Sequence, residues 1–135
     1  MDLGLNDKTA IVTGAGSGIG AAIVRALLHI PHQRALLVLN DLIDDEREPG
    51  VLAASLEVML TIDRNHERAR QKLDELVNGM HQLPAAWRRE LGRALGALDE
   101  SRYDEALMQL LHDEVTSVRK VAVFAAGREN HAAHL

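Results

Sequence analysis

Residues 110–122, LLHDEVTSVRKVA, decide the fold that the sequence predicts. The stretch begins as the apolar end of one helix, passes through an acidic and polar turn, and continues as a second helix of small and aliphatic residues. Two helices joined by so short a turn bury their apolar sides against each other. The stretch therefore predicts a helical hairpin.

The same pattern occurs earlier in the chain. Residues 39–45 again combine an apolar helix end with an acidic turn, and residues 51–56 are again small and aliphatic. A looser copy lies between the two. The first helices of the three copies are expected to begin about 34 residues apart, near Ala35, Ala69 and Asp104. A repeat of this length is typical of an α-solenoid, whose units bury their faces against their neighbours.

The last copy resembles a HEAT repeat. That family typically has an Asp in the turn and a Val-Arg pair at the start of the second helix, and here Asp113, Val118 and Arg119 occupy those positions. The resemblance covers about residues 35–128 and leaves residues 129–135 as a tail. It implies a mainly α fold, a HEAT-like α-solenoid of about three helical hairpins. An irregular helical bundle is the alternative.

A different pattern occupies the amino-terminal part. Residues 9–20, TAIVTGAGSGIG, read as a short apolar strand followed by a glycine-rich turn, and the apolar periodicity of residues 21–28 reads as a helix. Gly14 permits a tight turn, Gly18 lets the backbone approach a pyrophosphate, and Gly20 lets the helix pack close to the strand. Residues 1–28 therefore predict a β-turn-α segment of Rossmann type.

This segment resembles the amino terminus of the short-chain dehydrogenase/reductase family, and the resemblance can be extended to residue 41. The family pattern Thr-Gly-x-x-x-Gly-x-Gly is matched at every fixed position of residues 13–20. The resemblance implies that NAD, if it binds, contacts Gly14, Ser17, Gly18, Ile19, Gly20 and, at the end of a second strand, Asp41. A carboxylate at that position favours NAD over NADP because it repels a 2'-phosphate.

Residues 36–41, LLVLND, fit two structures. As a second strand they would extend the nucleotide fold and place Asp41 at the ribose. As the first helix of the first repeat they would make Asp41 a solvent-exposed acid. The leucine-rich composition favours the helix, and residues 29–33, HIPHQ, depart from the dehydrogenase pattern.

The catalytic residues of the dehydrogenase family are missing. The family uses a Tyr-x-x-x-Lys pair, but the single tyrosine, Tyr103, is followed four residues later by Leu107. Strand-like runs are also scarce after Asp41. We therefore expect no catalytic residues and no dehydrogenase activity.

Composition narrows the range of partners. The net charge is −5, from 15 basic and 20 acidic residues, and no basic cluster with interleaved aromatic residues is evident, so nucleic acid is not an expected partner. The chain has no cysteine, and its paired histidines lack a third ligand at helical spacing, so no metal site is expected. The uncharged run of residues 9–24 is too short and too rich in glycine to span a membrane. No membrane association and a cytoplasmic location are expected.

These observations predict a binding or scaffolding module of helical repeats. Its expected partner is a protein or peptide, or a second copy of the chain, and no cofactor is expected. The alternative is a truncated protein of short-chain dehydrogenase type that binds NAD(P) through its glycine-rich loop without transferring hydride.

Overall fold

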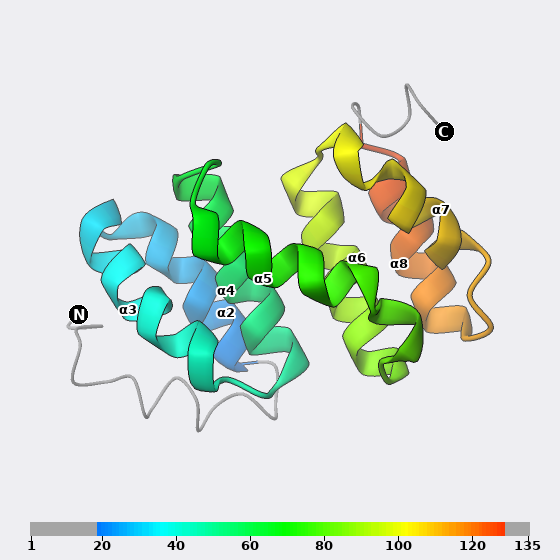
Figure 1. The fold of residues 1–135 in the computed structure, drawn as a ribbon, viewed down its shortest axis with the longest axis horizontal. Coiled ribbons are helices and arrows are strands. Elements are labelled where there is room, and N and C mark those ends of the chain that lie inside the picture. The colour runs from blue at the N-terminus through cyan, green and yellow to red at the C-terminus, as the bar shows by residue number, and fades with distance from the viewer. Residues whose placement is uncertain (1–18, 129–135) are drawn as a thin grey trace. The chain divides into compact units, whose positions relative to one another are not determined.

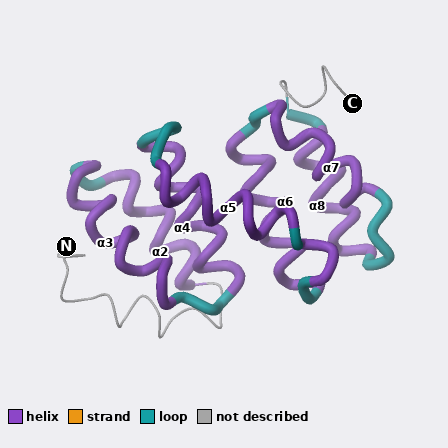
Figure 2. Tube along the Cα trace, in the orientation of Figure 1, coloured by secondary structure: helices purple, strands orange, loops and turns teal. Residues whose placement is uncertain are grey.

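The structure, a computed structural model, describes residues 19–128 as helices joined by short loops (Figure 1). The elements in chain order are α2 (Ile19–Ala26), η3 (Leu27–His29), α3 (His32–Asp45), α4 (Pro49–Ile62), α5 (Glu67–Asn78), η4 (Met80–Gln82), α6 (Ala85–Leu98), η5 (Ser101–Tyr103), α7 (Asp104–Leu111) and α8 (Thr116–Ala126). Residues 19–128 contain no strand (Figure 2). The predicted mainly α fold is confirmed.

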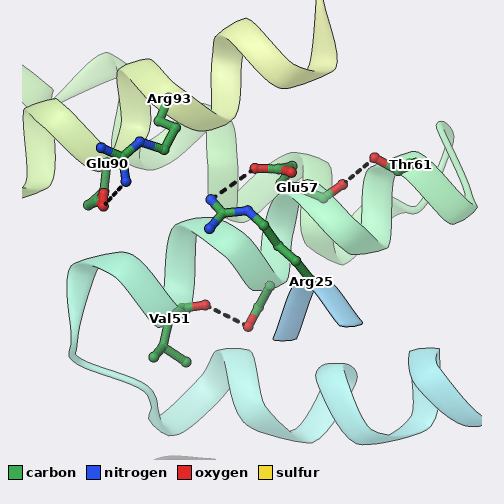
Figure 3. A network of polar contacts seen from close by, with 7 residues as sticks. Arg25, Val51, Glu57, Thr61, Glu90 and Arg93 are labelled. Carbon is green, nitrogen blue, oxygen red and sulfur yellow. Dashed lines mark hydrogen bonds and ion pairs between the residues drawn. The ribbon is translucent and has the colours of Figure 1, made fainter. Parts of the chain in front are cut away.

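The helices belong to two compact units that divide within α5, between Leu73 and Asp74. In the first unit, α2 and α3 both pack against α4. Ten of the fourteen residues of α4 are buried, which is the pattern of a central helix that is apolar all round. One ion pair joins α2 to α4: Arg25 Nη2 lies 3.3 Å from Glu57 Oε1 (Figure 3).

The acidic turn between α3 and α4 uses its carboxylates to satisfy backbone amides. Glu46 Oε1 accepts hydrogen bonds from the amides of Arg47 and Glu48, at 3.0 and 2.8 Å. Glu48 is the N-cap of α4, and its Oε2 accepts a bond of 2.8 Å from the amide of Val51. The first amides of a helix lack partners within the helix, so these two acids cap the start of α4.

In the second unit, α6, α7 and α8 pack against one another. Two glycines of α6 face α8: a Cβ placed on Gly92 would lie 3.2 Å from Cγ1 of Val121, and one on Gly96 would lie 2.7 Å from Cβ of Ala125. The later residue of α6 thus lies beside the later residue of α8, so the two helices run parallel. Because Gly92 and Gly96 have no side chains, the backbones of α6 and α8 approach closely at these positions.

The expected starts of three helices agree with the structure to within three residues. Helices α3, α5 and α7 begin at His32, Glu67 and Asp104. The alternative strand over residues 36–41 is wrong, because these residues lie in the middle of α3. Its buried apolar side chains recur at intervals of three and four residues, which is the period of a helix, namely Ala35, Val38, Leu39, Leu42 and Ile43.

The approach of α6 to α8 gives a first prediction. We expect Gly96→Val to lower the free energy of unfolding of the second unit by about 2–3 kcal/mol, because the added methyl groups must displace the backbone of Ala125. The control is Ala97→Val, at the next position of the same helix, where the side chain is exposed and the expected loss is below about 0.7 kcal/mol. Urea unfolding followed by the fluorescence of Trp87, the single tryptophan, reports on this unit. Equal losses for the two variants would contradict the close packing.

Candidate functional site

The structure describes only part of the predicted nucleotide loop. Gly14, Ser17 and Gly18 lie outside the described residues. Ile19 and Gly20 are the first two residues of α2, and Gly20 is buried. Helix α2 begins within two residues of the predicted start at residue 21, and it packs against α4 of the first unit.

Asp41, the predicted ribose ligand, is an exposed residue of α3. The strand end from which the resemblance would place its carboxylate does not form. Asp41 is thus a surface acid of a helix, as the helical interpretation predicts.

Tyr103, the single tyrosine, has a structural position. Its side chain is buried, and its hydroxyl donates a hydrogen bond of 2.8 Å to Oδ1 of Asp74. The other carboxylate oxygen of Asp74 accepts a bond of 2.8 Å from Nη2 of Arg102, whose guanidinium carbon lies 5.2 Å from the centre of the Tyr103 ring. A hollow of about 370 Å³ lies beside this cluster, with the amides of Asn78 and Gln109 in its lining.

The hollow is lined mainly by polar side chains. Asp74 is already engaged by Arg102 and by the hydroxyl of Tyr103. Two of the residues that line the hollow, Tyr103 and Asp74, are thus hydrogen-bonded to each other.

A half-buried ion pair joins Arg88 of α6 to Asp113 in the turn between α7 and α8. Nε of Arg88 donates to Oδ2 at 2.6 Å and Nη2 donates to Oδ1 at 3.1 Å, a bidentate pair whose side chains are only 11% and 9% exposed. Nη1 of Arg88 also donates to the carbonyl of Leu83 at 2.6 Å. The hydrogen bond from Arg88 lowers the pKa of Asp113, and the same bond raises the pKa of Arg88. This pair holds the turn against the start of α6.

The remaining polar groups of the turn are also satisfied. Oδ1 of Asp113 accepts a bond of 2.9 Å from the amide of Val115. Arg119 donates to the carbonyl of Asp113 at 2.7 Å and to Oγ1 of Thr116 at 2.9 Å. Val118 is fully buried. The three residues that carry the HEAT resemblance, Asp113, Val118 and Arg119, therefore build the hairpin and are not exposed for recognition.

The parallel pair of helices presents one exposed surface, which we call the α6–α8 face. Helix α7 packs against both α6 and α8, so the sides of these two helices that point away from α7 lie together. On α6, Leu91 and Leu95 are buried on one flank, whereas Arg93 is exposed on the other. The α6–α8 face consists of the half-buried Arg89 and five exposed residues: Arg93 from α6, Lys120, Val123 and Phe124 from α8, and Arg128 just beyond α8.

The α6–α8 face is apolar at its centre and basic around it. Phe124 is 76% exposed and Val123 is 62% exposed. The guanidinium carbon of Arg128 lies 5.8 Å from the centre of the Phe124 ring. Glu90 is the one acid of α6 and α8, and its side chain pairs with Arg93 at 3.1 Å (Figure 3). The face is therefore positive although the whole chain carries a net charge of −5.

The sequence did not reveal this face. Its basic residues are separated by about thirty residues of chain, so no cluster is visible until α6 and α8 lie side by side. A signal was nevertheless present: Arg89 and Arg93 are four residues apart, and so are Lys120, Phe124 and Arg128 in succession. Residues with this spacing share one side of a helix.

Other kinds of site are not seen in residues 19–128. In this range no three His, Asp or Glu side chains are grouped so that they would hold a metal ion. None of the helices described has the length and apolar content needed to span a bilayer. The chain matches no protein-family model, no curated protein and no solved structure.

The ion pair predicts a specific response to acid. Asp113 has a folded-state pKa below its unfolded value of about 3.9, so the unfolded chain binds the proton more readily and the pair stabilises the fold above that value. This contribution is lost as the pH falls from about 5 through the folded-state pKa.

We expect Asp113→Asn to lower the free energy of unfolding at pH 7 by about 2–3 kcal/mol, because Arg88 keeps its charge without its partner. The variant should also lose less further stability than the wild type between pH 5 and pH 3. Urea unfolding at several pH values, followed by the fluorescence of Trp87, measures both effects. A variant with wild-type stability and a wild-type pH profile would contradict this account.

Proposed function

We propose that the chain is a helical-repeat module that binds a protein or peptide partner, and that the α6–α8 face is its contact surface. The proposal is supported by the order of the helices in the second unit. Helices α6 and α8 are the second helices of two successive hairpins, and they run parallel. Helix α7 lies between them in sequence and packs against both. Stacked hairpins of an α-solenoid have this arrangement and use extended helical surfaces for binding.

The observation that carries the proposal is the exposure of Phe124. An aromatic side chain on α8 with three quarters of its surface in solvent buries little apolar area within the fold. Exposed apolar groups rimmed by polar residues are typical of interaction sites, and aromatic residues and arginine are enriched in such sites. Phe124 and Val123, surrounded by arginine and lysine, have this composition.

The proposal is also consistent with the chemistry of the rest of the second unit. Its polar clusters are internally paired, Arg88 with Asp113 and Asp74 with both Arg102 and Tyr103. Such pairs orient helices and turns. We therefore propose that the second unit acts by binding.

Site-specific crosslinking tests the proposal. We expect a photoreactive benzoylphenylalanine at position 124 to form discrete adducts in living cells, because the side chain lies at the centre of the proposed contact. The control is the same residue at position 37, since Leu37 is also an exposed apolar residue, 61% exposed on α3 of the first unit. Adduct masses on a denaturing gel distinguish a partner protein from a second copy of the chain. Identical adduct patterns from positions 124 and 37, or none from 124, would contradict the proposal.

A second candidate function is NAD binding by the glycine-rich loop. The observation that favours it is the start of α2 at Ile19, at the end of the glycine pattern and with Gly20 in its first turn, since a phosphate-binding loop ends at a helix amino terminus. The helical structure of residues 36–41 weighs against it, because the strand that would carry Asp41 to the ribose is absent.

Calorimetric titration with NAD tests this candidate. If the loop binds NAD, we expect saturable binding with a dissociation constant of about 1–100 μM. We also expect Gly18→Asp to abolish that binding, because a carboxylate repels the pyrophosphate of NAD. The matched control is Gly79→Asp, at a glycine outside the loop that has space for a side chain. Absence of saturable heat in the wild type would exclude this function.

A further inference from the structure

We infer that the α6–α8 face selects an extended acidic segment of a partner protein, with an apolar residue between acids at alternate positions. The inference rests on the proposed function and adds the chemistry of the partner. It is drawn from the charge of the face, from the exposed aromatic ring and from the spacing along α8.

The first argument is the excess of positive charge. Arg89, Arg93, Lys120 and Arg128 lie on the face, and Glu90, only 15% exposed, is the one acid beside them. Arg89 and Lys120 form no ion pair with any described residue, so their charges are available to a partner. Arg88 does not contribute, because Asp113 neutralises it within the unit. A partner that matches this face must be acidic, since complementary charge raises the association rate and rejects basic competitors.

The second argument is the aromatic ring between the cations. Phe124 lies one helical turn after Lys120 on α8, and the guanidinium carbon of Arg128, just beyond α8, lies 5.8 Å from the centre of the Phe124 ring. Burying this ring requires an apolar group from the partner, and a well-packed aromatic contact of this kind contributes more than a surface ion pair. The partner must therefore carry an apolar residue flanked by acids.

The third argument is the spacing. Lys120 and Phe124 are four residues apart on α8, which corresponds to about 6 Å of rise along a helix. An extended peptide advances about 6.6 Å for every two residues and places alternate side chains on one side. A peptide laid along α8 can therefore meet Lys120 with an acid and Phe124 with an apolar residue two positions further on, and a second acid beyond that residue can meet Arg128, which follows the end of α8.

A peptide fits this face better than a nucleic acid. Single-stranded nucleic acids are bound by successive aromatic rings that stack on successive bases, and here Phe124 is the one aromatic residue of the face. The net charge of −5 also repels a long polyanion, whereas a short acidic segment contacts only the basic face. An oligonucleotide therefore serves as a competing probe.

The test uses the full chain and three fluorescein-labelled probes followed by fluorescence anisotropy. The first peptide contains two copies of the sequence Glu-Ser-Leu-Ser-Glu. The second has Gln in place of every Glu, and the third probe is a single-stranded DNA of similar length and mixed sequence. We expect the acidic peptide to bind with a dissociation constant of about 10–100 μM at low salt and at least about 10-fold more tightly than either other probe. Its affinity should fall as the salt rises from about 50 to about 300 mM.

Exposed positions supply the variants, so the fold is retained and circular dichroism checks it. We expect Lys120→Glu to weaken binding of the acidic peptide about 10-fold and Phe124→Ala to weaken it about 5-fold. The matched control is Arg47→Glu, an equal change of charge at an exposed position in the turn between α3 and α4, where binding should stay within about 2-fold of the wild type.

Each outcome separates the inference from the proposed function. Equal binding of the acidic and neutral peptides, or equal weakening by Lys120→Glu and Arg47→Glu, overturns the acidic partner, while crosslinking through position 124 can still uphold a binding face. Tighter binding of the DNA overturns the peptide in favour of nucleic acid. Failure of all three probes to bind overturns the inference, and failure of crosslinking at position 124 as well overturns the proposed function.

Discussion

The half-buried ion pair between Arg88 and Asp113 holds the turn before α8 against the start of α6. Burying two charges is costly unless their remaining hydrogen-bonding groups are satisfied. Here the carboxylate receives two bonds from Arg88 and one from the amide of Val115, and Arg88 gives a third bond to the carbonyl of Leu83. The turn before α8 is thereby fixed at the start of α6. From that point α8 runs parallel to α6 over Gly92 and Gly96, and the α6–α8 face follows from this register.

The two acidic turns of the chain use their carboxylates differently. In the first unit, Glu46 and Glu48 bind amides of their own turn, and the turn is bounded by Pro49 at the start of α4. Near it, Arg68 of α5 donates to Asp44 at the end of α3, but this pair is exposed and contributes little stability. In the second unit, Asp113 reaches a buried arginine on another helix. In both turns, therefore, acids hold the backbone of the turn through hydrogen bonds.

The fold could be predicted from the sequence wherever one face of a helix is apolar. The period of the apolar residues located α3, α5 and α7 to within three residues, and it favoured a helix over a strand at residues 36–41. The pattern around Asp113 located the last turn. The identity of its partner could not be predicted, because Arg88 and Arg89 are adjacent residues of one type and only the packing of α6 decides which of them turns inward.

The α6–α8 face could not be predicted for a related reason. Its residues come from two helices, and their proximity depends on the parallel register, which is set by two glycines without any apolar periodicity of their own. A glycine within a helix lowers the predicted stability of that helix, whereas Gly92 and Gly96 here allow α6 to pack closely against α8. The glycine-rich loop has a specific sequence pattern. Its role as a nucleotide site stays a prediction, because Gly14, Ser17 and Gly18 lie outside the described residues.

The most direct test of this account is the register of α6 against α8, measured by nuclear Overhauser effects in the full chain. The account predicts cross-peaks between the α protons of Gly96 and the methyl group of Ala125, together with cross-peaks between Gly92 and the methyl groups of Val121. Cross-peaks that instead join Gly92 to Ala125 and Gly96 to Val121 would mean that the helices run antiparallel. That result would contradict the parallel pair and, with it, the face that the pair creates.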